Sequence, residues 1–246
     1  AVTIARSPDG QAATAADYVV EPGSNGAFVL AGPGISLRLR SALPGDFNVM
    51  NTAMAAVSLL MLGHGAHEVE AAVLADPHVP GRMERVGPSG PRIPLAVVDY
   101  AHTPDAVEAA IAALRPATDG PLVVVLGAGG ERDRGKRYAM GRAAATADVV
   151  IVTDDNPRGE DAGAISAAVL QGARSAGTNA RIEEVGGRRD AIARAVEIAA
   201  PAGSAATIAL VGKGHETGQE VQGVVHPFDD RDELSRALIA YTGADA

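Results

Sequence analysis

The stretch that decides the fold is Val149-Val-Ile-Val-Thr-Asp-Asp-Asn-Pro-Arg158. Its first half is an uninterrupted apolar run, which is typical of a strand buried on both faces of a parallel sheet. Its second half places carboxylates, an amide, a proline and an arginine at the end of that strand, where open α/β sheets bind their ligands. The proline ends the strand, and the planar guanidinium of Arg158 suits a carboxylate or a phosphate. Because Asp, Asn and Pro are also common in ordinary turns, the stretch alone leaves a purely conformational role open.

From about residue 82 onward, the chain alternates apolar strands with amphipathic helices. Further buried strands are predicted at 95–98, 122–126 and 208–211, with a shorter strand at 181–185. Helical patterns occupy roughly 103–114, 136–146, 161–175, 187–200 and 230–241. This alternation predicts an α/β fold with a doubly wound, mostly parallel, Rossmann-like sheet.

The residues before this region have a different pattern. Short strands are predicted at 2–6, 18–21, 27–30 and 35–40, followed by helices at about 46–63 and 66–75. Asp46 is expected to be the N-cap of the first of these helices. A Pro/Gly-rich segment from Pro77 to Gly81 then breaks the pattern. We therefore predict two domains, residues 1–81 and 82–246.

The composition excludes several classes of protein. A net charge of −9 argues against nucleic acid as a partner, and the absence of cysteine excludes disulfides and thiolate metal sites. The longest apolar stretch, around 54–62, is too short to span a bilayer, and the first residues lack the pattern of a signal peptide. We expect a monomeric, cytoplasmic protein that acts on small molecules, away from membranes, and we predict no metal ligand among its residues.

Polar residues follow four of the predicted strands at the point where each strand ends. The four segments are Asp99–Pro104, Gly127–Arg137, Asp154–Arg158 and Gly212–Glu216. Because the carboxyl ends of parallel strands lie at one edge of a sheet, these segments are expected to form a single site. In the last segment, glycines permit close approach of a ligand, and Lys213, His215 and Glu216 supply a cation, a titratable group and an anion.

Two of these segments also have simpler interpretations. Asp99 and Thr103 could cap the helix that begins at Pro104, and His102 could be a surface residue. The basic cluster at 132–137 could be a solvated loop with internal ion pairs.

Two nucleotide-binding patterns are matched only in part. Gly130–Lys136 fits G-x-x-x-x-G-K, but Arg137 follows where a P-loop has Ser or Thr, and the residues between the glycines are bulky and charged. We therefore reject a working P-loop here. Gly127-x-Gly129-x-x-Arg132 lacks the third glycine of a dinucleotide fingerprint, which makes a nicotinamide enzyme a weak alternative.

Two further polar features lie outside the four segments. Asn48 and Asn51 are three residues apart and share a helix face, where they could bind an adenine edge or simply belong to a capped helix start. Arg82 stands at the junction of the two predicted domains, where a linker arginine is usually solvated but domain closure could bring it onto a phosphate.

Six motifs, in order, together resemble the Mur ligases of peptidoglycan synthesis, in particular those that add diaminopimelate. The motifs are Gly45-Asp-Phe-Asn-x-x-Asn51, Gly81-Arg-Met-Glu84, Asp99-Tyr-Ala-His-Thr-Pro-Asp105, Gly129-Gly-Glu-Arg-Asp-x-Gly-Lys-Arg137, Asp154-Asp-Asn-Pro-Arg158 and Gly212-Lys-Gly-His-Glu216. The resemblance covers almost the whole chain. It implies that residues 1–81 are part of a central ATP-binding domain and that 82–246 are the C-terminal, amino-acid-binding domain.

The resemblance also implies roles for individual residues. Meso-diaminopimelate would be held by Arg132, Asp155, Asn156, Pro157, Arg158, Gly212 and Glu216. ATP would contact Asn51, Arg82 and Asp99, and the catalytic residues would be His102 and Lys213. The substrate carries two carboxylates and two amines, so arginine forks and anionic acceptors agree with this assignment.

The implied reaction uses ATP and Mg²⁺ to phosphorylate the γ-carboxylate of D-glutamate in UDP-MurNAc-L-Ala-D-Glu, after which the diaminopimelate amine attacks the acyl phosphate. The chain resembles the C-terminal half of such an enzyme, without its P-loop, and we expect it to be inactive alone. Two alternatives stay open, which are a non-catalytic amino-acid-binding module and a relative that adds lysine or glutamate. Arg158 argues against lysine, which has no distal carboxylate.

Overall fold

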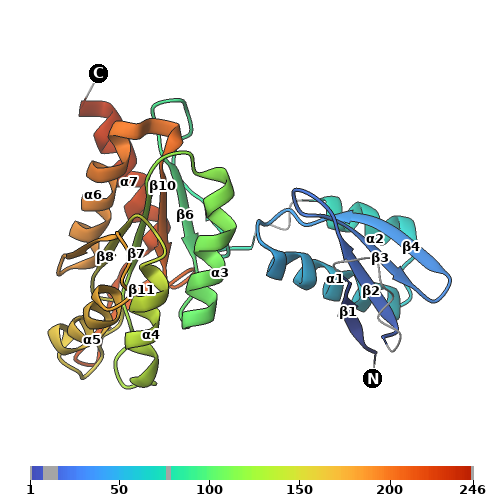
Figure 1. Cartoon of the computed structure of the whole chain (residues 1–246), viewed down its shortest axis with the longest axis horizontal. Helices are drawn as coiled ribbons and strands as arrows, with labels where there is room; N and C mark the ends of the chain where they lie inside the picture. Colours follow the sequence, from blue (N-terminus) through green and yellow to red (C-terminus); the bar gives the residue numbers. More distant parts are fainter. Residues whose placement is uncertain (1, 8–15, 76–78, 245–246) are drawn as a thin grey trace. The chain divides into compact units, whose positions relative to one another are not determined.

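The structure is a computed structural model that describes residues 2–7, 16–75 and 79–244. The chain divides into two compact units, Ala1–His78 and Val79–Ala246 (Figure 1). The division lies close to the Pro/Gly-rich segment at which the sequence pattern changes. Each unit has its own sheet and its own helices.

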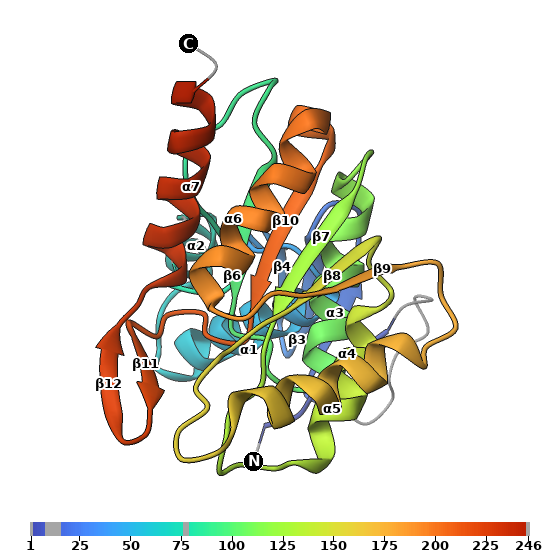
Figure 2. The same cartoon turned by 90° about the vertical axis from the view of Figure 1, so that its left-hand side faces the viewer.

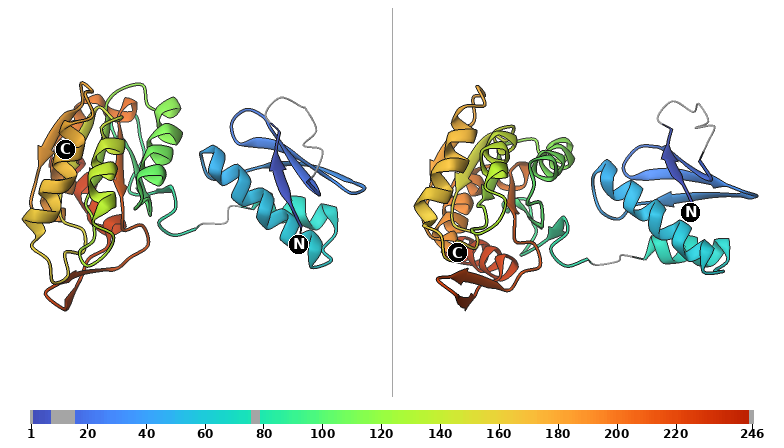
Figure 3. Two further views of the ribbon diagram at one scale, coloured as in Figure 1. Left: turned by 60° about the horizontal axis from the view of Figure 1, so that its bottom comes forward. Right: turned by 90° about the horizontal axis from the view of Figure 1, so that it is seen from below.

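The first unit is a four-stranded sheet with two helices on one face (Figures 1 and 3). Its elements are β1 (Ile4–Arg6), β2 (Tyr18–Pro22), β3 (Ala27–Gly32), β4 (Ile35–Arg40), α1 (Asp46–Met61) and α2 (Ala66–Leu74). β1 runs parallel to β2, and the other pairs are antiparallel. The alternation in β4 places Leu37 and Leu39 in a core with Val57 of α1 and Val69 of α2.

The predicted cap of α1 is wrong. Gly45 is the N-cap, with a φ of 97° that a residue with a side chain adopts only at a cost. Asp46 is instead the first residue of the helix, and its carboxylate pairs with Arg6 at 2.6 Å. A carboxylate in the first turn still interacts favourably with the helix dipole, which explains why the sequence suggested a cap.

The second unit contains a six-stranded sheet in the order β5-β6-β10-β7-β8-β9. Its strands are β5 (Glu84–Arg85), β6 (Leu95–Asp99), β7 (Leu122–Leu126), β8 (Val149–Val152), β9 (Arg181–Glu184) and β10 (Thr207–Val211). All neighbours are parallel except β5, which pairs antiparallel with β6. The predicted doubly wound, mostly parallel α/β fold is therefore confirmed, and of the six strands in this sheet only the two-residue β5 was not predicted.

Helices cover both faces of this sheet, which explains why the central strands are apolar on both sides. On one face lie α3 (Pro104–Leu114), α4 (Gly135–Ala144) and α5 (Ala162–Arg174), and on the other α6 (Arg188–Ala199) and α7 (Asp230–Ala244) (Figure 2). Short 3₁₀ turns follow α3 and α6, at Arg115–Ala117 and Ala200–Ala205. Among the described residues, no helix combines the length and apolar character needed to cross a bilayer.

The register of the sheet aligns the carboxyl ends of four strands, β6, β10, β7 and β8. Val211, the last residue of β10, lies opposite both Asp99 of β6 and Leu126 of β7. Leu126 in turn lies opposite Val152, the last residue of β8. The segments that follow these strands therefore leave the sheet side by side at its carboxyl edge.

A β-hairpin that the sequence analysis did not predict follows the loop after β10. Its strands are β11 (Gly218–Val221) and β12 (Val224–Pro227), joined by Gln222 and Gly223 with φ values of 50° and 76°. Two positive φ values in a two-residue loop match the hairpin turn whose twist suits antiparallel strands. The signal was weak because Gly218–Val221 is mostly polar and short, so it lacks the apolar pattern of a strand.

Candidate functional site

A cavity of about 390 Å³ lies at the carboxyl edge of the second sheet, and all four strand-end segments line it. The segment after β6 contributes Tyr100 and His102, and the segment after β10 contributes Gly212 and Glu216. The remaining lining residues come from the segments after β7 and β8 and from the start of α4, and are Gly127, Ala128, Gly129, Arg132, Asp133, Lys136, Met140, Asp155, Asn156 and Arg158. Of the seven residues predicted to bind the amino acid, six line this cavity and Pro157 does not.

Asn156 joins two of the segments, and strand β11, through its side-chain amide. Its Nδ2 donates to Glu216 Oε2 at 2.9 Å and to Asp155 Oδ1 at 3.1 Å. Its Oδ1 accepts from the main-chain N–H of Glu220 at 2.9 Å. Since the amide is buried and both of its ends are used, it fixes the two carboxylates relative to each other.

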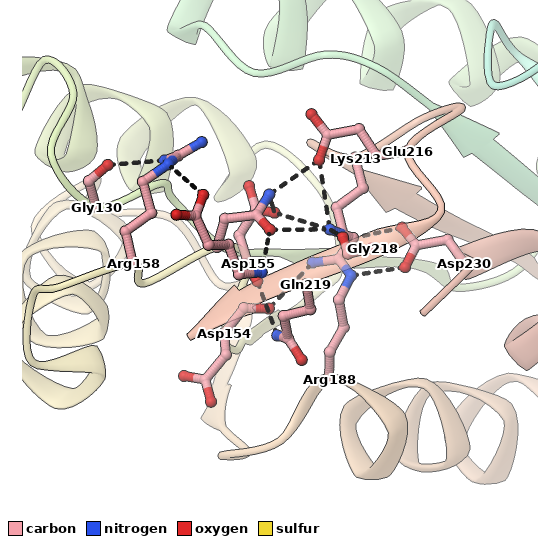
Figure 4. Close-up of polar contacts among 12 residues, drawn as sticks. Gly130, Asp154, Asp155, Arg158, Arg188, Lys213, Glu216, Gly218, Gln219 and Asp230 are labelled. Atoms are coloured by element: carbon pink, nitrogen blue, oxygen red, sulfur yellow. Dashed lines mark hydrogen bonds and ion pairs between the residues drawn. The ribbon is translucent and has the colours of Figure 1, made fainter. Parts of the chain in front are cut away.

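Lys213 is fully buried and does not line the cavity, although its side chain lies next to that of Glu216, which does (Figure 4). Its Nζ donates to the Gly218 carbonyl at 2.6 Å and lies 3.4 Å from Glu216 Oε2 and 3.7 Å from Asp155 Oδ1. Burial raises the pKa of the Asp155 carboxyl, while Arg188 and Lys213 act in the opposite direction. The ammonium thus orients and neutralises neighbouring carboxylates, and the catalytic role predicted for Lys213 stays a prediction.

Arg188 and Asp230 form a fully buried ion pair that the sequence analysis missed. The guanidinium Nε and Nη2 each lie 2.7 Å from a carboxylate oxygen of Asp230, in a bidentate arrangement (Figure 4). Nη2 also donates to the Val211 carbonyl at 3.1 Å, and Nη1 to the Asp154 carbonyl at 3.5 Å. The pair therefore anchors the ends of β10 and β8, from which two walls of the cavity begin.

Two arginines line the cavity with donors that remain available. Arg158 is partly exposed, and its Nη1 donates to the Gly130 carbonyl at 2.8 Å while its Nε lies 3.2 Å from a carboxylate oxygen of Glu220. Arg132 is exposed and forms no hydrogen bond or ion pair with any described residue. Such guanidinium groups can bind the carboxylates of a ligand.

His102 has a defined tautomer at the cavity. Its Nδ1 lies 2.9 Å from the Tyr100 carbonyl, which can only accept, so Nδ1 carries a proton and the lone pair of the neutral ring is on Nε2. The Tyr100 ring packs edge-on against the imidazole, with centroids 4.6 Å apart. The His102 carbonyl accepts from Lys136 Nζ at 2.8 Å, which joins this segment to the start of α4.

Comparison with known proteins identifies the family. The family described as Mur ligase, glutamate ligase domain, matches residues 81–214, which is more than half of the chain. The chain belongs to the Mur ligase family. The resemblance of its six motifs to this family is thereby confirmed.

Curated relatives of this Mur ligase chain carry the name UDP-N-acetylmuramoyl-L-alanyl-D-glutamate–2,6-diaminopimelate ligase. The protein from Streptomyces coelicolor is 47% identical over 215 residues, which covers 86% of this chain and 42% of the relative. The protein from Corynebacterium glutamicum is 47% identical over 208 residues, with 82% and 39% covered. The chain therefore spans less than half the length of these relatives.

Solved structures of Mur ligases and related enzymes share the fold. A structure of UDP-N-acetylmuramoyl-L-alanyl-D-glutamate–2,6-diaminopimelate ligase matches with a TM-score of 0.61 and 36% identity, covering 94% of this chain and 47% of that one. Folylpolyglutamate synthase from Mycobacterium tuberculosis, solved with ADP and AMPPCP, matches with a TM-score of 0.62 and 27% identity, covering 80% and 45%. These matches agree with the doubly wound sheet described above.

The residues predicted to contact ATP do not line the cavity of this Mur ligase chain. The Asp99 carboxylate accepts from the main-chain N–H groups of Met83 and Ala101, each at 2.8 Å, so it caps backbone turns. Arg82 is exposed and its guanidinium lies 4.5 Å from the centre of the Tyr100 ring. Asn51 belongs to the first unit, where its Nδ2 lies 3.4 Å from Asn48 Oδ1. Their contacts with ATP stay predictions.

The segment that resembles a P-loop uses its main-chain N–H groups within the protein. The N–H of Gly130 donates to the Asn156 carbonyl at 2.8 Å, and that of Glu131 donates to Glu160 Oε1 at 2.5 Å. Gly130 also packs so closely on Pro157 that an added Cβ would overlap the Pro157 carbonyl oxygen. Pro157 therefore supports the cavity wall from behind.

Glu160 anchors this segment through its carboxylate. It accepts two hydrogen bonds from Arg137, at 3.0 and 3.1 Å, in addition to the one from Glu131. These hydrogen bonds lower the pKa of Glu160 to about 2. Within the described ranges, no group of three or more His, Asp or Glu side chains is arranged to hold a metal ion.

Proposed function

We propose that this chain carries the amino-acid site of an ATP-dependent ligase that adds meso-diaminopimelate to UDP-MurNAc-L-Ala-D-Glu. The names of the curated relatives support this substrate, although the chain covers only 42% of the first of them. The observation that carries the proposal is the pairing of charges around one cavity. Two guanidinium groups, of Arg132 and Arg158, line it together with two carboxylates, of Asp155 and Glu216. A ligand with two carboxylates and two ammonium groups matches that set.

In the proposed reaction, ATP phosphorylates the γ-carboxylate of D-glutamate, and an amine of diaminopimelate then attacks the acyl carbon. The new C–N bond forms as the C–O bond to phosphate breaks, phosphate leaves, and the amine loses a proton. Binding the amino acid in a fixed orientation is the contribution of the cavity. In its neutral form, His102 has its lone pair on Nε2, which is suited to accept the amine proton.

The phosphoryl-transfer step is not assigned to residues of this chain. The described residues include no cluster for Mg²⁺, and the Asp99 carboxylate is already occupied by two main-chain N–H groups. The first unit, with Asn51, belongs to the ATP-binding domain in this proposal, and Arg82 follows it at the start of the second unit. The chain is then the amino-acid-binding part of a cytoplasmic, monomeric enzyme that uses ATP and Mg²⁺.

A glutamate-adding ligase is the second candidate, because the chain is 27% identical to a folylpolyglutamate synthase over most of its length. Glutamate also has two carboxylates and would engage both arginines. It has one ammonium group, so the ligand would offer a cation to only one of the carboxylates of Asp155 and Glu216, and the other would keep Lys213 as its nearest cation. The cavity therefore favours the diamino acid.

Calorimetric titration of the purified chain with meso-diaminopimelate, lysine and glutamate tests the proposal. We expect diaminopimelate to bind most tightly, and Arg158→Ala to weaken its binding by about 10- to 100-fold, because a charge-assisted hydrogen bond contributes roughly 1.5–3 kcal/mol. Lysine binding is expected to change little. The control is Glu197→Ala, which removes an exposed ion pair with Arg194 on α6.

Two outcomes would contradict the proposal. Unchanged diaminopimelate binding by Arg158→Ala would remove the role of this arginine, and tighter binding of glutamate than of diaminopimelate would favour the second candidate. A separate assay for phosphate release tests the expected inactivity of the isolated chain. Release that depends on both ATP and diaminopimelate would show that these 246 residues turn over alone.

A further inference from the structure

The β11–β12 hairpin holds Arg158 by its main chain. The N–H of Arg158 donates to the Glu220 carbonyl at 3.0 Å, and the Arg158 carbonyl accepts from the N–H of Gln222 at 2.7 Å. These two bonds form an isolated parallel bridge between Arg158 and Val221. The hairpin, which follows the loop after β10, is thus hydrogen-bonded to the loop after β8.

The main chain of Arg158 needs this support. Its φ is 52°, in the left-handed region that residues with side chains rarely adopt. Such a conformation persists where the surroundings determine it, and it is common at functional sites. The hydrogen bonds to Glu220 and Gln222 flank the strained residue on both sides, so they fix the direction in which its side chain leaves the loop.

The side chain of Arg158 is held at two of its three nitrogens. Nη1 donates to the Gly130 carbonyl at 2.8 Å (Figure 4). Nε faces Glu220 Oε2 at 3.2 Å. Nη2 has no hydrogen-bond acceptor among the described residues. Glu220 and Gly130 therefore fix the plane of the guanidinium and leave an edge free for a ligand carboxylate.

We propose that Glu220 is a positioning residue for Arg158, and that the hairpin thereby sets the preference for an amino acid with a distal carboxylate. This inference rests on the proposed function, because it assumes that the ligand of Arg158 is such a carboxylate. Glu220 itself does not line the cavity and is not expected to touch the substrate. Its carboxylate acts by restricting Arg158 before the ligand arrives, which lowers the entropy lost on binding.

Calorimetry with Glu220 variants measures this effect. We expect Glu220→Ala to weaken meso-diaminopimelate binding by about 3- to 10-fold, with Glu220→Gln intermediate because its amide oxygen can still accept from Nε. Lysine binding should be unchanged. In an Arg158→Ala background, Glu220→Ala should have no further effect, since the residue through which it acts is gone.

The control for a lost glutamate is Glu197→Ala, which removes an exposed ion pair with Arg194 on α6. Circular dichroism and thermal unfolding establish that each variant is folded. Tighter binding of diaminopimelate by Glu220→Ala would show that Glu220 competes with the ligand, and equal weakening for diaminopimelate and lysine would show a general loss of structure. Either result would overturn the proposal.

A measurement without ligand separates this inference from the proposed function. In a ¹⁵N-labelled sample, the Nε–H signal of Arg158, assigned by its loss in Arg158→Lys, should exchange slowly with water in the unmodified chain and rapidly in Glu220→Ala. If the chain binds no diaminopimelate but this change occurs, the proposed substrate fails while the positioning by Glu220 stands. An Nε–H signal that is unaffected by Glu220→Ala would show that Glu220 does not restrain Arg158.

Discussion

Arginine side chains occur in two parts of the cavity region, which we call the floor and the rim, and they have different hydrogen-bond partners in the two. We define the floor as Arg188, Asp230 and Lys213, which are buried and bonded to one another or to main-chain carbonyl groups. We define the rim as Arg132 and Arg158, which keep donors that no described residue accepts from. Charges that the protein itself satisfies stabilise the fold, whereas charges with free donors are available to a ligand. Mutations in the floor should therefore change stability first, and mutations in the rim should change binding alone.

Asp230→Asn is expected to have the largest effect. It leaves the fully buried guanidinium of Arg188 without a counter-charge, and Arg188 cannot lose its proton. Breaking a buried pair in this way costs about 3–5 kcal/mol in the free energy of unfolding. Urea denaturation followed by circular dichroism measures the change. The matched surface variant Glu197→Gln, which weakens the exposed pair with Arg194, should change stability by less than about 0.5 kcal/mol.

Arg132→Ala is the corresponding test of the rim. We expect meso-diaminopimelate to bind roughly 10-fold more weakly, because one charge-assisted hydrogen bond is lost, while the free energy of unfolding stays within about 0.5 kcal/mol. Calorimetry and urea denaturation on the same sample measure both quantities. A large loss of stability would show that Arg132 serves the fold, and the distinction between floor and rim would then fail for this residue.

The fold could be predicted because the second unit's strands are buried on both faces. Val149–Val152 and Leu122–Leu126 are continuous apolar runs, and the positions of their ends were correct to within about one residue. The convergence of four polar segments also followed from the strand pattern, because parallel strands present their carboxyl ends at one edge. The insertion of β10 between β6 and β7 did not follow, since local sequence carries no information on strand order.

The supports of the site were not predictable, for physical reasons. Arg188 and Asp230 are 42 residues apart, and nothing in their local sequence shows that either is buried. The hairpin strand that bonds to Arg158, Gly218–Val221, has a single apolar residue, so it lacks the apolar alternation that marks a strand. Lys213 lay in a glycine-rich segment typical of ligand sites, yet the structure buries its ammonium, and Lys213 does not line the cavity. Burial of a charged side chain depends on partners that only the folded chain assembles.

Glu160 gives a test that depends on pH. Its carboxylate accepts from Arg137 and Glu131, and its pKa falls from 4.5 to about 2 in the folded state. Because the folded-state pKa is lowered, the stabilisation is fully present above pH 4.5 and is lost as the pH falls through about 2. The difference in unfolding free energy between the unmodified chain and Glu160→Gln should therefore shrink over this range. Urea denaturation between pH 5 and pH 2 measures it, and a constant difference would contradict the assigned ion pair.

Thr153→Val is expected to have the smallest effect. It tests whether the buried Thr153 hydroxyl, next to the cavity segment 154–158, has a hydrogen-bond partner. Thr153 directly precedes Asp154, is 2% exposed, and its Oγ1 has no hydrogen-bond partner among the described residues. An unpaired buried hydroxyl is unfavourable, and valine has the same shape, so we expect a gain of about 0.5–1 kcal/mol in the free energy of unfolding. A loss of stability would instead show that the hydroxyl has a partner, such as an ordered water. A buried polar group near the floor could then respond to a bound ligand. Residues outside the rim would in that case also contribute to binding, and the distinction between floor and rim would not hold for Thr153.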